Sequence, residues 1–135
     1  MVKKNIKKVN LNLIRKKIDE IDKSILKSLS KRANLVIEAG LSKEKIGDTS
    51  YYRPEREAQI IHSLILENKG KLSQSHIKSI YKEIISACFS LEKKIEILFL
   101  GPKGTYSELA AIDHFGNSAE RVPCSDINQI FTKIT

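Results

Sequence analysis

Apolar and polar residues alternate with a helical period over the first third of the chain. Residues 11–45 contain no proline, and isoleucine, leucine or valine recurs there at steps of three and four. These recurring apolar residues are Ile14, Ile18, Ile21, Ile25, Leu29 and Val36. Such spacing predicts one face of a single α-helix of roughly 45 Å. Because that length exceeds the diameter of any domain this chain could form alone, the apolar face is expected to lie against a partner.

A second, shorter helix is predicted after a loop at residues 46–52. Pro54 suits the first position of this helix, where it needs no hydrogen-bond donor. Glu55 and Glu57 follow in the first turn and favour the positive end of the helix dipole. The Asn-Lys-Gly sequence at residues 68–70 is expected to end the helix.

A third helix is predicted from Ser73 or Ser75, either of which can cap its first turn. The inward residues expected on the second and third helices are Ile60, Ile61, Leu64, Ile65, Ile77, Ile80, Tyr81, Ile84, Ile85, Cys88 and Phe89. The domain organisation predicted so far is a basic tail over residues 1–10 and a three-helix domain over residues 11–94. Its helices are long, short and medium in length.

The pattern changes at Ile95. Residues 95–100 form a short apolar run of β-prone side chains, and a Gly-Pro-Lys-Gly turn ends it. Residues 105–115 then look helical, with Thr105 or Ser107 as the cap. Strand, glycine-rich turn and helix are typical of the opening of an α/β domain. Residues 95–135 are too few to complete one, so we expect them to bury no core by themselves and the strand to stay unpaired.

The net charge of +8 is unevenly distributed. Residues 1–95 hold 21 basic and 11 acidic side chains, a net charge of +10, whereas residues 96–135 have a net charge of −2. A basic region of this kind suits an anionic partner, either a nucleic acid or a small polyanion. Only five of the 24 basic residues are arginine. Since arginine grips a carboxylate with two hydrogen bonds, these few arginines are candidates for carboxylate binding, with solvated surface charge as the alternative.

Other features of the sequence narrow the class of protein. No run reaches the roughly 18 apolar residues that a membrane span needs. The basic N-terminus lacks the apolar stretch of a secretory signal. Cys88 and Cys124 give neither a metal-binding spacing nor a disulfide framework. These observations fit a protein of the reducing cytoplasm.

Three cations on the first helix have an informative spacing. Arg32 and Lys43 are 11 residues apart, about three full turns, so they share a face and could converge on a ligand between them. Arg15 lies some 25 Å before Arg32 and on another face. One chain cannot bring Arg15 and Arg32 to the same small molecule. Two antiparallel copies of the helix could, if each chain lent its Arg15 to the other's site.

Several motifs resemble those of a known family. The segments that carry the resemblance are Leu13-Ile14-Arg15, Ile18-Asp19, Ile21-Asp22, Lys31-Arg32, Lys43, RPERE at 53–57 and IISACFSLE at 84–92. Together they are similar to the all-helical chorismate mutases, and more narrowly to the mutase of the bifunctional chorismate mutase–prephenate dehydratase proteins. LGPKGTYSELAA at residues 100–111 resembles the opening of the dehydratase domain. The resemblance implies an all-α mutase protomer in an intertwined homodimer, followed by an incomplete α/β segment at 95–135.

The resemblance also implies roles for individual residues. The substrate-binding set that it assigns is Arg15, Arg32, Lys43, Arg56, Glu57, Cys88 and Glu92. The three arginines, with Arg15 coming from the partner subunit, would surround the two carboxylates of chorismate. Lys43 would contact a carboxylate and the ether oxygen of the breaking bond, and Glu57 would accept a hydrogen bond from the ring hydroxyl.

Two residues on the third helix complete the set. Glu92 stands where a Gln or Glu faces the ether oxygen, and Cys88 stands one turn before it, where a small polar residue is usual. Cys88 fits plain core packing better than substrate contact, and a Glu near a helix end is also common. One departure from the family pattern is Arg53, which replaces an aspartate and is left out of the catalytic set of Arg32, Lys43 and Glu92.

The implied reaction is the Claisen rearrangement of chorismate to prephenate in phenylalanine biosynthesis. It needs no metal and no cofactor; the protein supplies a bound chair-like conformer and positive charge at the ether oxygen. Glu92 must be protonated to donate a hydrogen bond there. No nucleic-acid or membrane partner is expected. Because the rest of a dehydratase would lie beyond residue 135, we expect neither dehydratase activity nor inhibition by phenylalanine.

Two other functions remain as alternatives. The first is a basic helical module that binds nucleic acid, but its basic residues would cluster on a short recognition helix, whereas here acids are interleaved with them. The second is a helical dimerisation module without catalysis, which the intact set of Arg, Lys and Glu residues argues against. A DNA shift assay and an assay of chorismate consumption would distinguish the three.

Overall fold

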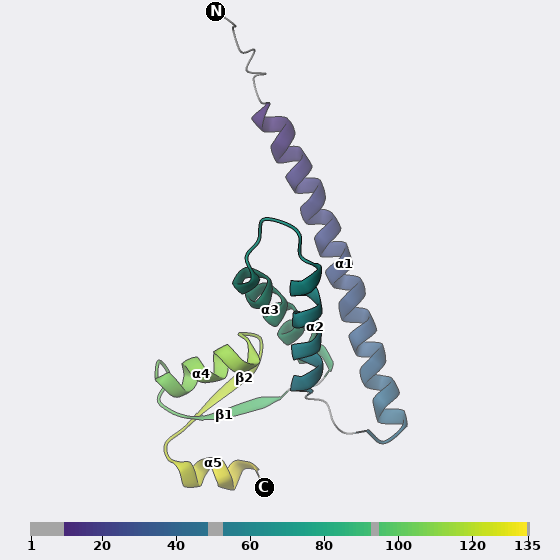
Figure 1. The fold of residues 1–135 in the computed structure, drawn as a ribbon. Helices are drawn as coiled ribbons and strands as arrows, with labels where there is room; N and C mark the ends of the chain where they lie inside the picture. Colours follow the sequence, from purple (N-terminus) through teal and green to yellow (C-terminus); the bar gives the residue numbers. More distant parts are fainter. Residues whose placement is uncertain (1–9, 49–52, 93–94, 135) are drawn as a thin grey trace, which may run out of the picture. The chain divides into compact units, whose positions relative to one another are not determined.

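The computed structural model describes residues 10–48, 53–92 and 95–134. They form five helices and two strands (Figure 1): α1 Leu11–Lys45, α2 Pro54–Glu67, α3 Gln74–Glu92, β1 Glu96–Leu100, α4 Tyr106–Phe115, β2 Glu120–Cys124 and α5 Ile127–Ile134. The chain divides into two compact units, residues 1–32 and residues 33–135. The predicted tail lies outside the described residues except for Asn10, as do positions 49–52 of the predicted loop.

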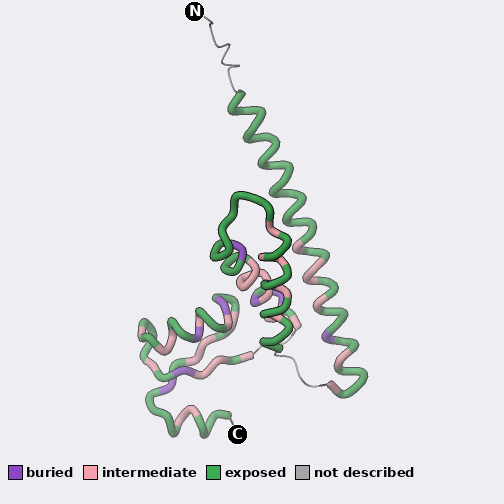
Figure 2. The backbone as a smooth tube through the Cα atoms, in the orientation of Figure 1, coloured by how far each residue is buried: buried purple, intermediate pink, exposed green. Residues whose placement is uncertain are grey.

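The first unit consists, where it is described, of Asn10 and the N-terminal part of α1. Asn10 caps the helix, because its Oδ1 accepts a hydrogen bond of 3.3 Å from the backbone N–H of Leu13. The side chains of Ile14, Ile18, Ile21 and Ile25 are 41–58% exposed, and Figure 2 shows this stretch as exposed. The prediction of one long helix is confirmed. The apolar face on it is left uncovered within the single chain.

In the second unit, α2 begins and ends where the sequence predicted. Pro54 is its first residue, and the chain leaves the helix at Asn68 with an extended backbone. Ile61 is buried, and Ile60, Leu64 and Ile65 are half-buried on the same face. This face packs against α3. The buried face predicted for α2 is therefore confirmed.

Ser73 is the cap of α3, since its Oγ accepts a hydrogen bond of 3.2 Å from the backbone N–H of His76. One prediction about the buried face of α3 is wrong, and one buried residue was not anticipated. Ile80 was expected inside but is 46% exposed, whereas the polar Ser86, which was not expected inside, is only 7% exposed. Ser86 is buried by a contact with α4: its Oγ donates a hydrogen bond of 2.7 Å to the carbonyl oxygen of Phe115.

The α/β segment contains more structure than was predicted. Strand β2 pairs with β1 in parallel, from Glu96 opposite Glu120 to Leu100 opposite Cys124, and α4 is the connection between them. The expectation of an unpaired strand is therefore wrong. Phe99, Ala111 and Cys124 are buried at 5%, 7% and 1% exposure. The parallel pair with its crossover helix thus buries a small apolar core, which the sequence analysis did not expect.

The turn after α4 lies directly against α3. Gly116 has a φ of 79°, and a Cβ at this position would lie 2.5 Å from the Cβ of Ser86. Next to it, the backbone N–H of Asn117 donates to Oε1 of Glu83 at 3.2 Å, and Nδ2 of Asn117 donates to the same oxygen at 3.2 Å. The α/β segment is therefore anchored to α3 by a glycine that permits close approach and by hydrogen bonds on both sides of it.

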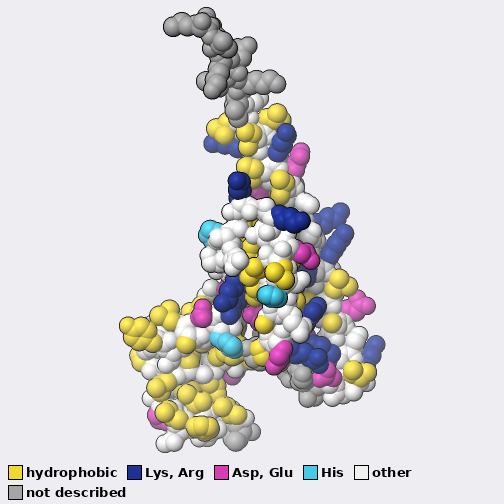
Figure 3. All heavy atoms as spheres, in the orientation of Figure 1, with side chains coloured by type: hydrophobic (Ala, Val, Ile, Leu, Met, Phe, Trp, Pro, Cys, Tyr) yellow, Lys and Arg dark blue, Asp and Glu magenta, His cyan; other side chains and the backbone are white. Residues whose placement is uncertain are grey.

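Thr105 is the N-cap residue of α4, but its side chain does not cap the helix. Its hydroxyl instead donates to the carbonyl oxygen of Leu100 at 3.4 Å, while Glu108 accepts a hydrogen bond of 2.6 Å from the backbone N–H of Gly104. At the other end of the segment, α5 has exposed Ile127, Phe131 and Ile134; Figure 3 shows hydrophobic side chains at this surface. No helix within the described residues is long and apolar enough to cross a bilayer.

Candidate active site

The C-terminal part of α1 and the end of α3 meet at a lysine and a glutamate that the sequence analysis singled out. Nζ of Lys43 donates a hydrogen bond of 2.9 Å to Oε1 of Glu92. The side chain of Glu92 is 6% exposed and that of Lys43 is 25% exposed. Because a carboxylate is costly to bury unless a cation or donors accompany it, Lys43 compensates the burial of Glu92. The contact holds a cation and a carboxyl group side by side at the edge of the second unit's helices.

Gly40 makes this contact possible. It is buried and lies three residues before Lys43 on α1. A Cβ at position 40 would lie 2.7 Å from Cγ of Glu92 and 3.4 Å from its Oε1. The side chain of Glu92 therefore crosses α1 over the backbone of Gly40 to reach Lys43. Gly40 was not assigned to the site from the sequence. Its signal there was a glycine inside a predicted helix, where glycine is less favourable than alanine by about 1 kcal/mol.

Cys88 is buried at 6% exposure on α3, and it is a free thiol. It lies four residues before Glu92, so the two side chains share one face of the helix. Its burial agrees with core packing and with a place beside Glu92, the two roles considered for it.

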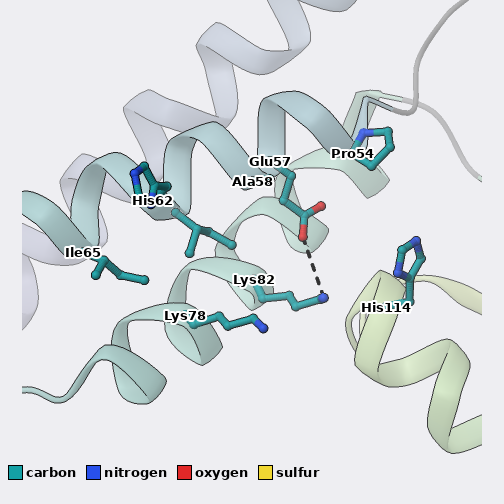
Figure 4. Close-up of a pocket in the computed structure, with 9 residues that line it drawn as sticks. Pro54, Glu57, Ala58, His62, Ile65, Lys78, Lys82 and His114 are labelled. Atoms are coloured by element: carbon teal, nitrogen blue, oxygen red, sulfur yellow. Dashed lines mark ion pairs between the residues drawn. The ribbon is translucent and has the colours of Figure 1, made fainter.

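Glu57 lies in different surroundings. On α2 it forms an ion pair with Lys82 of α3 at 4.0 Å, and both side chains are 21% exposed. The pair lines a pocket of about 340 Å³. Figure 4 shows that Lys78 from α3 and His114 from α4 line it as well. None of the other six residues of the predicted substrate-binding set lines this pocket. Lys82, which contacts Glu57, was not anticipated from the sequence.

The three arginines of the predicted set differ in how far they are buried. Arg56 is exposed on α2, and Arg15 is exposed on the N-terminal part of α1. Arg32 is half-buried, and its Nη1 is buried without a hydrogen-bond partner among the described residues. A buried donor that lacks an acceptor costs about 1–3 kcal/mol, so such a group is typical of a site where another molecule supplies the acceptor.

Arg53, which the sequence analysis left out of the catalytic set, forms an ion pair with Asp48 through Nη2 and Oδ2. Both residues belong to the region between α1 and α2. In the described parts of the chain, no group of three or more His, Cys, Asp or Glu side chains is arranged to hold a metal ion.

Comparison with known proteins agrees with the order of segments along the chain. Residues 14–93 match the family model described as chorismate mutase type II, and residues 97–135 match that of prephenate dehydratase. The first match includes α2, α3 and all but the first turn of α1, and therefore every residue of the predicted substrate-binding set. The second match includes α4, β2, α5 and all of β1 but its first residue.

Three curated relatives carry the description bifunctional chorismate mutase/prephenate dehydratase. The protein of Aquifex aeolicus is 43% identical over 128 residues, which is 92% of this chain and 35% of the relative. The protein of Pseudomonas aeruginosa is 33% identical over the same shares. That of Neisseria gonorrhoeae is 36% identical over 120 residues, 89% of this chain and 32% of the relative. The chain thus spans about a third of the length of these relatives. It belongs to the chorismate mutase type II family and continues into a prephenate dehydratase segment.

Proposed function

We propose that the helical part of this chain catalyses the rearrangement of chorismate to prephenate in aromatic amino acid biosynthesis. The single observation that carries the proposal is the contact between Lys43 and Glu92, 2.9 Å long, within the region that matches the mutase family. It places a cation beside a carboxyl group, one on each of the two helices that hold most of the predicted substrate-binding set.

The reaction needs positive charge at one particular atom. In the rearrangement the C–O bond of the ether breaks ahead of formation of the new C–C bond, so negative charge grows on the ether oxygen. The ammonium group of Lys43 would stabilise that charge, and a fixed cation does so without reorganising during the reaction. Chorismate also has to be held in a chair-like conformer with its reacting carbons close together.

Glu92 contributes a hydrogen bond to the same oxygen in this proposal. An ionised carboxylate can only accept, so Glu92 must carry a proton when it faces the ether oxygen. In the structure Oε1 of Glu92 accepts from Lys43. The other oxygen of a protonated carboxyl group is then the donor available to the substrate.

The two carboxylates of chorismate require further cations. Arg32 supports this assignment because its buried Nη1 has no acceptor in the described residues, and a substrate carboxylate would supply one. Arg56 is exposed and could reach a ligand. Arg15 is 17 positions before Arg32 on the same straight helix, about 25 Å away, so both can bind one molecule only if they come from different chains.

The proposal therefore includes a homodimer. Ile14, Ile18 and Ile21 are 41%, 51% and 58% exposed in the single chain, and an apolar stripe of this kind is stabilised by about 25 cal/mol for each Å² that a partner covers. A second copy, antiparallel to the first, would cover the stripe and bring its Arg15 to the site.

The place of action proposed is the cytoplasm. Both Cys88 and Cys124 are free and buried thiols, which agrees with a reducing compartment. The relatives are described by two activities, chorismate mutase and prephenate dehydratase. Prephenate is the product of the mutase and the substrate of the dehydratase, so the two reactions would follow one another.

An assay of chorismate consumption by the purified chain tests the proposal. Loss of chorismate absorbance, with prephenate as the product and with a molecular mass that corresponds to two chains, is the expected result. A stable dimer that leaves chorismate unchanged would instead identify a dimerisation module without catalysis.

A further inference from the structure

A pocket between α2, α3 and α4 contains two lysines and two histidines to which the mutase reaction gives no role, beside Glu57, which belongs to the predicted substrate-binding set. Its volume is about 340 Å³, within the range of small-molecule sites. It lies wholly within the second compact unit. Two of its walls are mutase helices, and the third is the end of α4 in the dehydratase segment (Figure 4).

The polar lining of this pocket is mostly cationic or neutral. Lys78 and Lys82 are one turn apart on α3 and share a face, and His62 of α2 and His114 of α4 also line the pocket. Figure 4 shows the ammonium groups of both lysines extending toward the space between the helices. Glu57 is the one acid among the lining residues, and its contact with Lys82 is a long one of 4.0 Å.

The remaining lining is apolar. Ile61 and Ile65 form part of the α2 wall, together with Pro54 and Ala58. Ile61 is buried and Ile65 half-buried. A bare inorganic anion would contact the lysines but leave this apolar wall uncovered, whereas an apolar molecule without charge would leave the lysines unused.

We propose that this pocket binds a small organic anion, a carboxylate attached to an apolar body, at the junction of the mutase helices and the dehydratase segment. The carboxylate lies between the ammonium groups of Lys78 and Lys82, and the imidazole of His114 can donate a hydrogen bond in either protonation state. The apolar body lies on Ile61 and Ile65. Binding does not require the mutase reaction, and Lys78 and Lys82 lie outside the predicted substrate-binding set.

Titration by NMR with 3-phenylpropionate as the probe tests this proposal. We expect saturable shifts of the backbone amides at residues 57–65, 78–82 and 112–116, with a dissociation constant on the order of 1 mM because the pocket is open and its lysines are partly solvated. The uncharged 3-phenylpropionamide keeps the apolar body but not the charge, and inorganic phosphate keeps the charge but not the apolar body. Both should bind more weakly than the carboxylate. Equal binding of either one, or no saturation by the carboxylate, would overturn the proposal.

Variants locate the site. Lys78→Met keeps the length of the side chain but removes its charge, and should raise the dissociation constant about three- to fivefold, the range for a partly exposed ion pair. Lys71→Met, in the loop before α3, makes the same change of charge outside the pocket and should have no effect. Lys78→Gln repeats the comparison if the methionine variant aggregates.

A further variant separates this site from the proposed mutase site. Arg32→Ala should leave binding of 3-phenylpropionate unchanged even if it abolishes chorismate consumption. Loss of binding in Arg32→Ala, together with unchanged binding in Lys78→Met, would show that the probe occupies the mutase site and that this pocket binds nothing. Failure of the mutase assay in the unaltered chain leaves the binding test intact.

Discussion

Lys43 and Glu92 are 49 positions apart in the chain, yet Nζ of one and Oε1 of the other are joined by a hydrogen bond of 2.9 Å. The contact ties the last turns of α1 to the last turn of α3. Glu92 is almost completely buried there, at 6% exposure of its side chain. The position of the carboxyl group is therefore determined by its neighbours, and the proposed reaction depends on that position and on its protonation.

The pH dependence of the reaction should follow the protonation of Glu92. A carboxyl group that has to donate a hydrogen bond works only in its protonated form, and the protonated fraction falls as the pH rises. We therefore expect kcat/KM to decrease as the pH rises. Glu92→Gln carries a permanent donor and should give a nearly flat profile. The same slope in both proteins would remove Glu92 from the mechanism.

Gly40→Ala tests the path of the Glu92 side chain. The added Cβ would lie 2.7 Å from Cγ of Glu92, so the carboxyl group has to move away from Lys43. We expect kcat/KM to fall about 10- to 100-fold, as displacements near 1 Å can cause. Thermal stability should fall, because loss of the Lys43 contact by the buried Glu92 outweighs the advantage of about 1 kcal/mol that alanine has over glycine in a helix.

The matched control for this substitution is Gly70→Ala. A Cβ at position 70 would meet only Oδ1 of Asn68, at an ordinary 3.4 Å. Kinetics with chorismate and a melting curve of each variant make the comparison. A Gly40→Ala variant with the activity of the unaltered chain would mean that the Lys43–Glu92 contact is not needed.

Arg32→Ala should be almost inactive and still folded. The substitution removes a charge assigned to a substrate carboxylate, for which we expect a loss of at least about 100-fold in kcat/KM. It leaves stability largely intact, because the buried Nη1 has no acceptor to lose in the described residues. Arg53→Ala is the control, since Arg53 pairs with Asp48 at a partly exposed position and should change activity little. Similar activities of the two variants would contradict the role given to Arg32.

Mixing two inactive variants tests whether Arg15 crosses between subunits. If each site combines Arg32 of one chain with Arg15 of the other, a dimer of Arg15→Ala with Arg32→Ala has one intact site and one with both defects. After unfolding and refolding of an equal mixture, about half of the dimers are mixed, so about a quarter of the original activity should return. No return of activity in a mixture that forms mixed dimers would place both arginines in one chain's site.

Gly116→Ala should destabilise the second unit. The backbone at Gly116 has a φ of 79° and a ψ of 174°, a region open almost only to glycine, and holding an alanine there costs on the order of 1–3 kcal/mol. A Cβ would in addition lie 2.5 Å from Cβ of Ser86. Gly104→Ala is the control, because its φ is also positive, at 83°, but nothing lies within 4 Å of the added carbon. Urea denaturation should rank Gly116→Ala as the less stable variant; equal midpoints would mean that the contact with α3 does not hold the turn in place.

The first four helices could be predicted from the sequence because their signals are local, whereas α5 was not anticipated. The spacing of Ile14, Ile18 and Ile21 and the absence of proline fix α1, and Pro54 fixes the start of α2. Strand β2 could not be predicted in the same way. It contains Pro123, which cannot donate to a sheet and is rare inside strands, and it begins with the charged Glu120 and Arg121. Only the pairing with β1 makes these residues a strand.

The same distinction between local signals and contacts of distant residues applies to the candidate site. Lys43 and Glu92 could be found because each matches a family motif. Gly40 stands out in the sequence only as a glycine inside a helix and Lys82 not at all, since the importance of both lies in contacts with residues more than 20 positions away. The burial of Ser86 depends in the same way on a distant residue, through its hydrogen bond to the carbonyl oxygen of Phe115. The exposure of Ile80 on α3 was likewise not visible in the sequence.

The close approach of Gly116 to Ser86 has a consequence for how this protein can evolve. A side chain at position 116 needs the room that the Ser86 side chain now takes, and a larger residue at position 86 would push into the backbone of the turn. Position 116 is therefore closed to a side chain, and position 86 to a larger side chain, while the other residue stays as it is. Among homologous chains, those with a side chain at position 116 should differ at position 86 as well, and the two substitutions should be inherited as a pair.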